Sequence, residues 1–140
     1  MYAPGSMGGG WSGIYYYSSE NEQELPPVAF MAQFTLPGED GTFAGVITDD
    51  GPLGLADARG VQYGAQVRFQ KLYRALPHRE TPAPIRYDGT LSPDGSRITG
   101  TWELSVRRLF GLWTREAHGI WEADRMPTGE LIQTDLPTKN

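Results

Sequence analysis

An alternation of apolar and polar residues with a period of two recurs in eight separate segments of this 140-residue chain. Successive side chains of a β-strand point to opposite faces, so the pattern predicts strands that bury one face. Turn sequences interrupt it, and "PGEDG" and "SPDGS" each carry an Asp-Gly step that tolerates the positive φ of a tight hairpin. We predict strands at Trp11–Ser18, Val28–Leu36, Thr42–Asp49, Leu53–Arg59, Gln66–Arg74, Ile85–Ser92, Arg97–Leu104 and Arg115–Ala123.

Eight consecutive strands with short connections predict an all-β fold, an eight-stranded antiparallel up-and-down β-barrel, because closure removes exposed sheet edges. The 18 glycines and 11 prolines agree with a chain of many turns. A β-sandwich is the alternative, although it usually needs longer crossover connections. We expect residues 1–125 to form one barrel domain and residues 126–140 to form a partly flexible tail.

Composition excludes several classes of function. The net charge of −5 argues against a nucleic-acid partner, which would require clustered Lys and Arg. The absence of cysteine excludes disulfides and thiol catalysis, and no apolar run is long enough to span a membrane as a helix. His78 and His118 are forty residues apart and are supported by no carboxylate pattern, so we predict no metal site and no cofactor. The first ten residues lack the features of a signal peptide, which leads us to expect a cytoplasmic protein.

A bulky apolar residue stands two positions before a glycine in four of these strands, in the sequences WSG, FAG, YDG and ITG. Residues i and i+2 of a strand share a face, so each pair places a large side chain and a glycine on the same side. The glycines either allow the strands to bend at barrel corners or make room for a ligand, and both explanations remain open. This register predicts an inward face composed of Trp11, Tyr15, Tyr17, Phe30, Phe34, Phe43, Ile47, Val67, Phe69, Tyr73, Ile85, Tyr87, Leu91, Ile98, Trp102 and Trp121.

The same register places Lys71 inward, between Phe69 and Tyr73. Lys71 either extends to solvent at the rim or serves as an anion-binding or hydrogen-bonding group in a lined cavity. Asp49 and Arg125 share the inward parity and are expected near a mouth of the barrel. Aromatic walls with a few polar groups are typical of small-molecule sites. The candidate ligand-binding residues are Tyr15, Tyr17, Phe69, Lys71, Tyr73, Tyr87, Trp102, Trp121 and Arg125.

The outward face of the first three strands is also apolar, which predicts a surface covered by a partner subunit or by the tail. Residues 105–114 add apolar side chains where a polar turn is expected, so this segment is a lid, a subunit contact or a continued hairpin. We predict a homo-oligomer, either a dimer or a tetramer. The candidate interface residues are Ile14, Tyr16, Met31, Val46, Leu109, Phe110, Leu112 and Trp113.

Several short motifs resemble the avidin and streptavidin group of calycin-type barrels, whose barrel is shared by the lipocalins. "GGW" at 9–11 resembles the Gly-x-Trp that opens that family's first strand, and "GTFAG" at 41–45 resembles its third strand. "TWEL" at 101–104 and "GIW" at 119–121 are similar to its seventh and eighth strands. Trp113 stands near the position of a tryptophan that family members lend to a neighbouring subunit's ligand. The resemblance implies a ligand-binding barrel.

The sequence departs from that family at two positions that contact biotin. Gly13 stands where the resemblance places an asparagine that hydrogen-bonds the ureido group, and Ile47 stands where it places a tyrosine. We therefore predict a barrel that binds a small apolar or aromatic molecule other than biotin. The alternatives are a protein-interaction barrel with a filled core, and a barrel isomerase or cyclase, for which Lys71 or Asp49 would be the candidate acid or base, although no catalytic residue is assigned.

Overall fold

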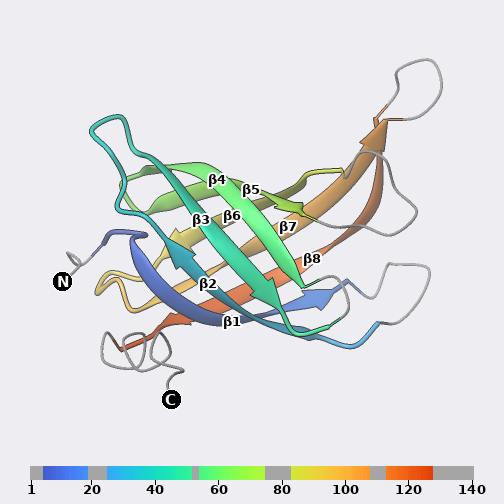
Figure 1. Ribbon diagram of the computed structural model, residues 1–140, viewed down its shortest axis with the longest axis horizontal. Coiled ribbons are helices and arrows are strands. Elements are labelled where there is room, and N and C mark those ends of the chain that lie inside the picture. Colours follow the sequence, from blue (N-terminus) through green and yellow to red (C-terminus); the bar gives the residue numbers. More distant parts are fainter. Residues whose placement is uncertain (1–4, 19–24, 52–53, 75–82, 108–112, 128–140) are drawn as a thin grey trace.

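The computed structural model is a closed, eight-stranded antiparallel barrel in which consecutive strands pair and β8 pairs with β1 (Figure 1). The structure describes residues 5–18, 25–51, 54–74, 83–107 and 113–127, without the side chains of 106, 107 and 113–116. The predicted up-and-down barrel is confirmed. The strands are β1 (Gly9–Tyr17), β2 (Val28–Phe34), β3 (Thr42–Asp49), β4 (Leu55–Tyr63), β5 (Gln66–Tyr73), β6 (Ile85–Leu91), β7 (Arg97–Arg107) and β8 (Trp113–Arg125).

The clearest difference from the predicted strands is β4, which continues four residues beyond the expected end at Arg59. Gly64 and Ala65 then form a two-residue turn into β5, and Tyr63 pairs with Gln66 across it. Gly64 has a φ of +57°, a conformation that glycine adopts at no steric cost. A glycine between two alternating runs is a hairpin signal, so this turn was detectable in the sequence.

Adjacent strands run in opposite directions, so the odd-numbered strands finish at one rim of the barrel and the even-numbered strands finish at the other (Figure 1). We call the first rim the Lys71 end, because Lys71 lies close to the end of β5. We call the second the Trp11 end, because Trp11 pairs there with Arg125, the last residue of β8. The connections at the Trp11 end, residues 35–41, 64–65 and 92–96, are described throughout.

The segment before β1 closes the Trp11 end. Met7 is buried, its N–H donates to the Gln62 side chain over 2.9 Å, and its carbonyl accepts the Trp11 indole N–H over 2.9 Å. The Arg125 guanidinium lies over the Trp11 ring, 4.4 Å from its centroid, and donates to the carbonyls of Ser6 and Gly8. These contacts occupy the polar groups of the segment and seal this rim.

Aromatic rings fill the interior above this seal. Phe69 is in the middle of the packing, with ring centroids 5.5 Å from Phe34, 5.7 Å from Trp121 and 4.9 Å from Tyr87, on which it stacks. Every residue of the predicted inward face is buried, apart from Tyr17 and Ile85, which are half-buried near the Lys71 end. The predicted register is therefore confirmed.

The inward glycines are needed for close packing between neighbouring strands and rings. A Cβ at Gly100 would lie 1.7 Å from the Asp88 carbonyl oxygen, and one at Gly89 would lie 2.7 Å from the Trp121 ring. At Gly13 and Gly45, too, a Cβ would clash with backbone oxygens and phenylalanine rings. At these four positions the space is already occupied, so the structure favours packing over room for a ligand.

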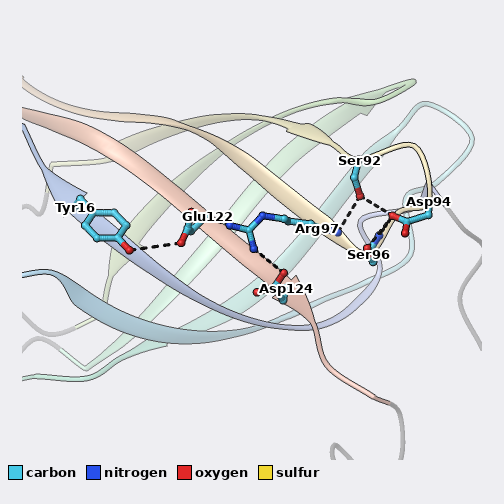
Figure 2. Close-up of polar contacts among 7 residues, drawn as sticks. All are labelled: Tyr16, Ser92, Asp94, Ser96, Arg97, Glu122 and Asp124. Carbon is cyan, nitrogen blue, oxygen red and sulfur yellow. Dashed lines mark hydrogen bonds and ion pairs between the residues drawn. The ribbon is translucent and has the colours of Figure 1, made fainter.

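Polar contacts on the outer surface cross the strands where the barrel closes (Figure 2). Arg97 of β7 donates to Glu122 and Asp124 of β8, each over 2.8 Å, and the Tyr16 hydroxyl of β1 lies 3.5 Å from Glu122 (Figure 2). In the turn before β7, Asp94 accepts hydrogen bonds from the backbone N–H and hydroxyl of Ser96 and the hydroxyl of Ser92, which lower its pKa to about 2 (Figure 2). These exposed contacts help to define the register of β7, β8 and β1.

The described backbone of residues 105–107 and 113–114 continues the hairpin of β7 and β8. β7 extends to Arg107 and β8 begins at Trp113, with a register shift between Leu104 and Ser105. Of the three predicted roles, the continued hairpin is therefore the one that the backbone shows. The interface candidates Leu109, Phe110 and Leu112 lie outside the described residues, as does the side chain of Trp113.

Candidate functional site

An ion pair between Lys71 and Asp49 lies inside the barrel near the Lys71 end. The Lys71 ammonium donates to both carboxylate oxygens of Asp49, each over 2.8 Å. Lys71 is 1% exposed and Asp49 is 6% exposed, so Lys71 is buried in the interior and the prediction that it extends to solvent at the rim is wrong. Two buried charges are stable only when each compensates the other and further hydrogen bonds satisfy them.

Three tyrosines surround this ion pair. The hydroxyls of Tyr15 and Tyr73 both donate to the carboxylate of Asp49, the former over 3.0 Å, and they lie 3.5 Å from each other. The Lys71 ammonium lies 4.8 Å from the ring centroids of Tyr15 and Tyr73, and 5.6 Å from that of Tyr87. A cation near aromatic ring faces gains electrostatic stabilisation when it is desolvated. The ion pair is thus held in an aromatic, hydrogen-bonding cage.

Burial controls the protonation of this cage. Desolvation, reinforced by the charge of Asp49, raises the pKa values of Tyr15, Tyr17, Tyr73 and Tyr87, so these phenols keep their protons and act as hydrogen-bond donors. Desolvation also lowers the pKa of Lys71, while the adjacent carboxylate of Asp49 opposes this shift. A phenol whose proton is not already donated to Asp49 is therefore a candidate for binding an oxygen atom of a ligand.

The barrel should lose stability at alkaline pH because of these phenols. The folded state binds their protons more tightly than the unfolded chain, whose tyrosines titrate near pH 10.0. Their contribution is complete below pH 10.0 and is lost as the pH rises through their folded-state pKa values. Lys71 has the opposite effect on stability. Its pKa is lowered in the folded state, so protonation of the unfolded chain disfavours folding as the pH falls below 10.5.

Tyrosinate absorbance and circular dichroism, followed together during an alkaline titration, test this prediction. Four of the seven tyrosines should ionise only as the β-sheet signal disappears. Ionisation of all seven with the sheet intact would contradict the buried cage.

The other aromatic residues that were predicted to bind a ligand lie beside or below the cage. Trp102 makes edge contacts with Tyr15 and Tyr17, with centroids 5.7 and 5.1 Å apart, and its indole N–H donates to the Tyr16 carbonyl over 3.0 Å. Phe69, Tyr87 and Trp121 form the packed layer underneath. The structure therefore brings together eight of the nine predicted ligand-binding residues in one continuous interior, with the polar ones at the Lys71 end.

Arg125 is the exception. It lies at the Trp11 end, over Trp11, whereas Asp49 lies at the opposite end of the barrel. Asp49 and Arg125 were expected near a mouth of the barrel, and they lie at opposite rims, because β3 and β8 run in opposite directions. The sequence analysis expected Asp49 near a mouth of the barrel and did not predict its ion pair with Lys71, which lies two strands away.

A hollow of about 540 Å³ lies on the outer surface, across β6, β7, β8 and the end of β1, and Tyr17 and Trp102 of the candidate set contribute to its lining. Asp88 in this hollow is already paired with Arg68 and Arg86, over 2.7 and 2.9 Å. The hollow is thus a region where opposite charges compensate each other on the surface. We place the candidate site in the interior, where the charges are buried.

The outward orientation of the predicted interface residues is confirmed for those that are described. Met31 and Val46 are exposed, and Ile14 and Tyr16 are half-buried on the outer face of β1. Sequence reasoning missed Ile120, which is 56% exposed and pairs with Tyr16 across the seam between β1 and β8. Ile120 lies on β8, which becomes a neighbour of β1 only when the barrel closes. The pattern of the first three strands therefore did not indicate it.

Comparison with known proteins adds no family to this description. No protein-family model matches the chain, and no curated protein matches it significantly. The part of the chain that the structure describes contains no group of three or more metal-binding side chains. The same residues form no helix long and apolar enough to cross a membrane. The fold and the interior site therefore carry the functional argument.

Proposed function

We propose that this barrel binds a small, largely apolar or aromatic molecule at its Lys71 end. The observation that carries the proposal is the gathering of a buried ion pair and several proton-bearing phenols at one end of an otherwise apolar interior. Pockets with aromatic walls and a few convergent polar groups are typical of small-molecule sites. A core that needed only to be filled could be entirely apolar at lower desolvation cost.

The difference between the two ends supports the same proposal. Hydrogen bonds and the Arg125 guanidinium occupy the Trp11 end, whereas at the Lys71 end the residues that the structure describes include half-buried side chains; parts of the connections there lie outside the described residues. Tyr17, Val28 and Ile85 pack against the core there and remain partly accessible. A ligand would enter past these side chains and contact Trp102.

Acetophenone, a small aromatic ketone, is a suitable first probe. The chain has four tryptophans, whose indole N–H groups give separate signals in a ¹H–¹⁵N NMR spectrum. Acetophenone should shift the Trp102 signal in a saturable manner and leave Trp11, at the sealed end, unchanged. A Tyr63→Ser variant serves as a control, because this side chain is 71% exposed and lies outside the interior. A Trp102 signal that does not move with saturating probe would refute the proposal.

A protein-interaction barrel with a filled core is the second candidate. The continuous ring contacts of Phe69 with Phe34, Tyr87 and Trp121 favour it, since they leave these side chains densely packed. On this alternative, no small probe would bind inside. The same NMR titration therefore distinguishes the two functions.

The relation to avidin-like and lipocalin-like barrels is also a proposal, supported by the short motifs and the shared closed barrel. We propose that the ligand is not biotin, because Gly13 and Ile47 supply no polar side chain to a ureido group. A cytoplasmic location is proposed from the absence of cysteine.

We further propose self-association through the outer face of β1 to β3. Met31 is 45% exposed, and Val46 is exposed on the same side of the sheet. Exposed apolar side chains gathered on one face favour a covered surface. Analytical ultracentrifugation should detect a dimer or tetramer at micromolar concentration, and the double variant Met31→Glu and Val46→Glu should shift the protein to monomer. A monomeric wild-type protein would contradict this proposal.

A further inference from the structure

We propose that the ligand carries an uncharged hydrogen-bond-accepting oxygen, such as a ketone or amide carbonyl, which the hydroxyl of Tyr87 and the ammonium of Lys71 bind together. This inference rests on the proposed function, because it names the chemistry of the molecule that would occupy the Lys71 end. Its basis is the set of hydrogen bonds that the buried cage leaves incomplete.

Tyr87 provides the first incomplete group. The side chain is 2% exposed, and its hydroxyl has no hydrogen-bond partner in the described part of the chain. Its ring is held by the stack on Phe69 and by an edge contact with Trp121, with centroids 4.9 and 5.4 Å apart. Buried hydroxyls are nearly always hydrogen-bonded, so an unmatched one requires an explanation.

The hydroxyl of Tyr87 belongs to the polar cage. The ring of Tyr87 borders the cage, since the Lys71 ammonium lies near its face, and burial raises the pKa of Tyr87. With its proton retained, the Tyr87 hydroxyl is available as a donor toward this end. The rings of Phe69 and Trp121 restrict its movement from the other side.

Lys71 provides the second incomplete group. Two hydrogen bonds from its ammonium go to Asp49, and the third N–H has no oxygen or nitrogen partner among the residues that the structure describes. The ammonium lies 5.6 Å from the centroid of the Tyr87 ring. Lysine can only donate, so a group that satisfies it together with Tyr87 must accept two hydrogen bonds. A carbonyl oxygen has the two lone pairs that this requires.

The charge of the cage decides against a carboxylate. Asp49 already neutralises Lys71 and also accepts from Tyr15 and Tyr73. A second carboxylate would be buried without its own counter-ion and would be repelled by Asp49. An uncharged acceptor adds hydrogen bonds to the cage without adding net charge.

Three probes of similar shape test the inference by NMR titration: acetophenone, ethylbenzene, which lacks the oxygen, and benzoate, which is anionic. Acetophenone should bind roughly 3–10-fold more tightly than ethylbenzene, as expected for one or two net hydrogen bonds. Tyr87→Phe should reduce this preference, because only Lys71 would then donate to the oxygen, while ethylbenzene affinity stays unchanged. Tyr16→Phe is the matched control and should retain the preference, because its hydroxyl lies on the outer surface near Glu122. Tyr87→Phe should also unfold at a temperature no lower than the wild type, because it removes only an unmatched hydroxyl.

The outcomes separate this inference from the proposed function. Equal binding of acetophenone and ethylbenzene to the wild type would overturn the inference and leave the binding function intact. Benzoate binding more tightly than acetophenone would overturn it in favour of an anionic ligand. A preference for acetophenone that is undiminished in Tyr87→Phe would remove Tyr87 from the site. Absence of binding by all three probes would overturn both the function and the inference.

Discussion

Replacing Lys71 by methionine is expected to lower the free energy of unfolding by about 3–5 kcal/mol, as measured by urea denaturation at neutral pH. Methionine fills a similar volume, so the loss comes from the charge. Asp49, 6% exposed, would remain buried without the ammonium that accompanies it in the folded state. An uncompensated buried carboxylate either destabilises the fold or takes up a proton.

Two further variants identify the cause of this loss. Lys71→Met combined with Asp49→Asn removes both charges and keeps an oxygen that accepts from Tyr15 and Tyr73, so it should recover most of the stability. Arg74→Met removes the exposed ion pair with Asp57 and should change stability little, because solvent screens that pair. A Lys71→Met protein as stable as the wild type would mean that the ammonium is not required to compensate Asp49.

Replacing Phe69 by alanine is expected to cost about 3–5 kcal/mol in unfolding free energy, because it removes a ring from the middle of the packed interior. Phe69 is 2% exposed, and its ring contacts those of Phe34, Tyr87 and Trp121. Gly60 of β4 pairs with Phe69 and has no side chain that could fill the resulting cavity. A Cβ added at Gly60 would lie 2.5 Å from the Cβ of Phe69.

Tyr63→Ala is the matched control for this second prediction. It also removes an aromatic ring, but from a side chain that is 71% exposed, and it should cost much less. Similar unfolding free energies for the two variants would show that the interior is loosely packed. Such a result would also weaken the filled-core alternative, which depends on dense packing around Phe69.

The fold was predictable because each of its components is local. The alternation of apolar residues identifies the strands, the Asp-Gly steps identify hairpins, and short connections make sequential pairing the simplest arrangement. The register was also predictable: in "WSGIYYYSS" the pair Trp11 and Gly13 directs Tyr15 and Tyr17 inward and leaves Tyr16 outside, as the structure shows. The last four residues of β4 were not predicted as strand, because the alternation of apolar and polar residues is less clear around Val61.

The candidate site was predictable only in part. Side-chain parity placed Lys71 inside but left open whether it was buried or at the rim. The answer depends on Asp49, which is 22 residues away and lies on β3 while Lys71 lies on β5. These strands are not neighbours in the sheet, since β4 lies between them. Their side chains meet across the barrel interior, a contact that no local pattern encodes.

The sequence by itself determined which side of each strand is buried, because a period of two assigns every side chain to one of two faces. Only the tertiary structure decided where along the barrel axis each inward side chain lies, because this position depends on strand direction and on the stagger between strands. Parity placed Asp49, Lys71 and Arg125 on one face. The pairing of β3 and β5 with β4 brought Asp49 to Lys71, and the opposite direction of β8 left Arg125 at the far end, over Trp11.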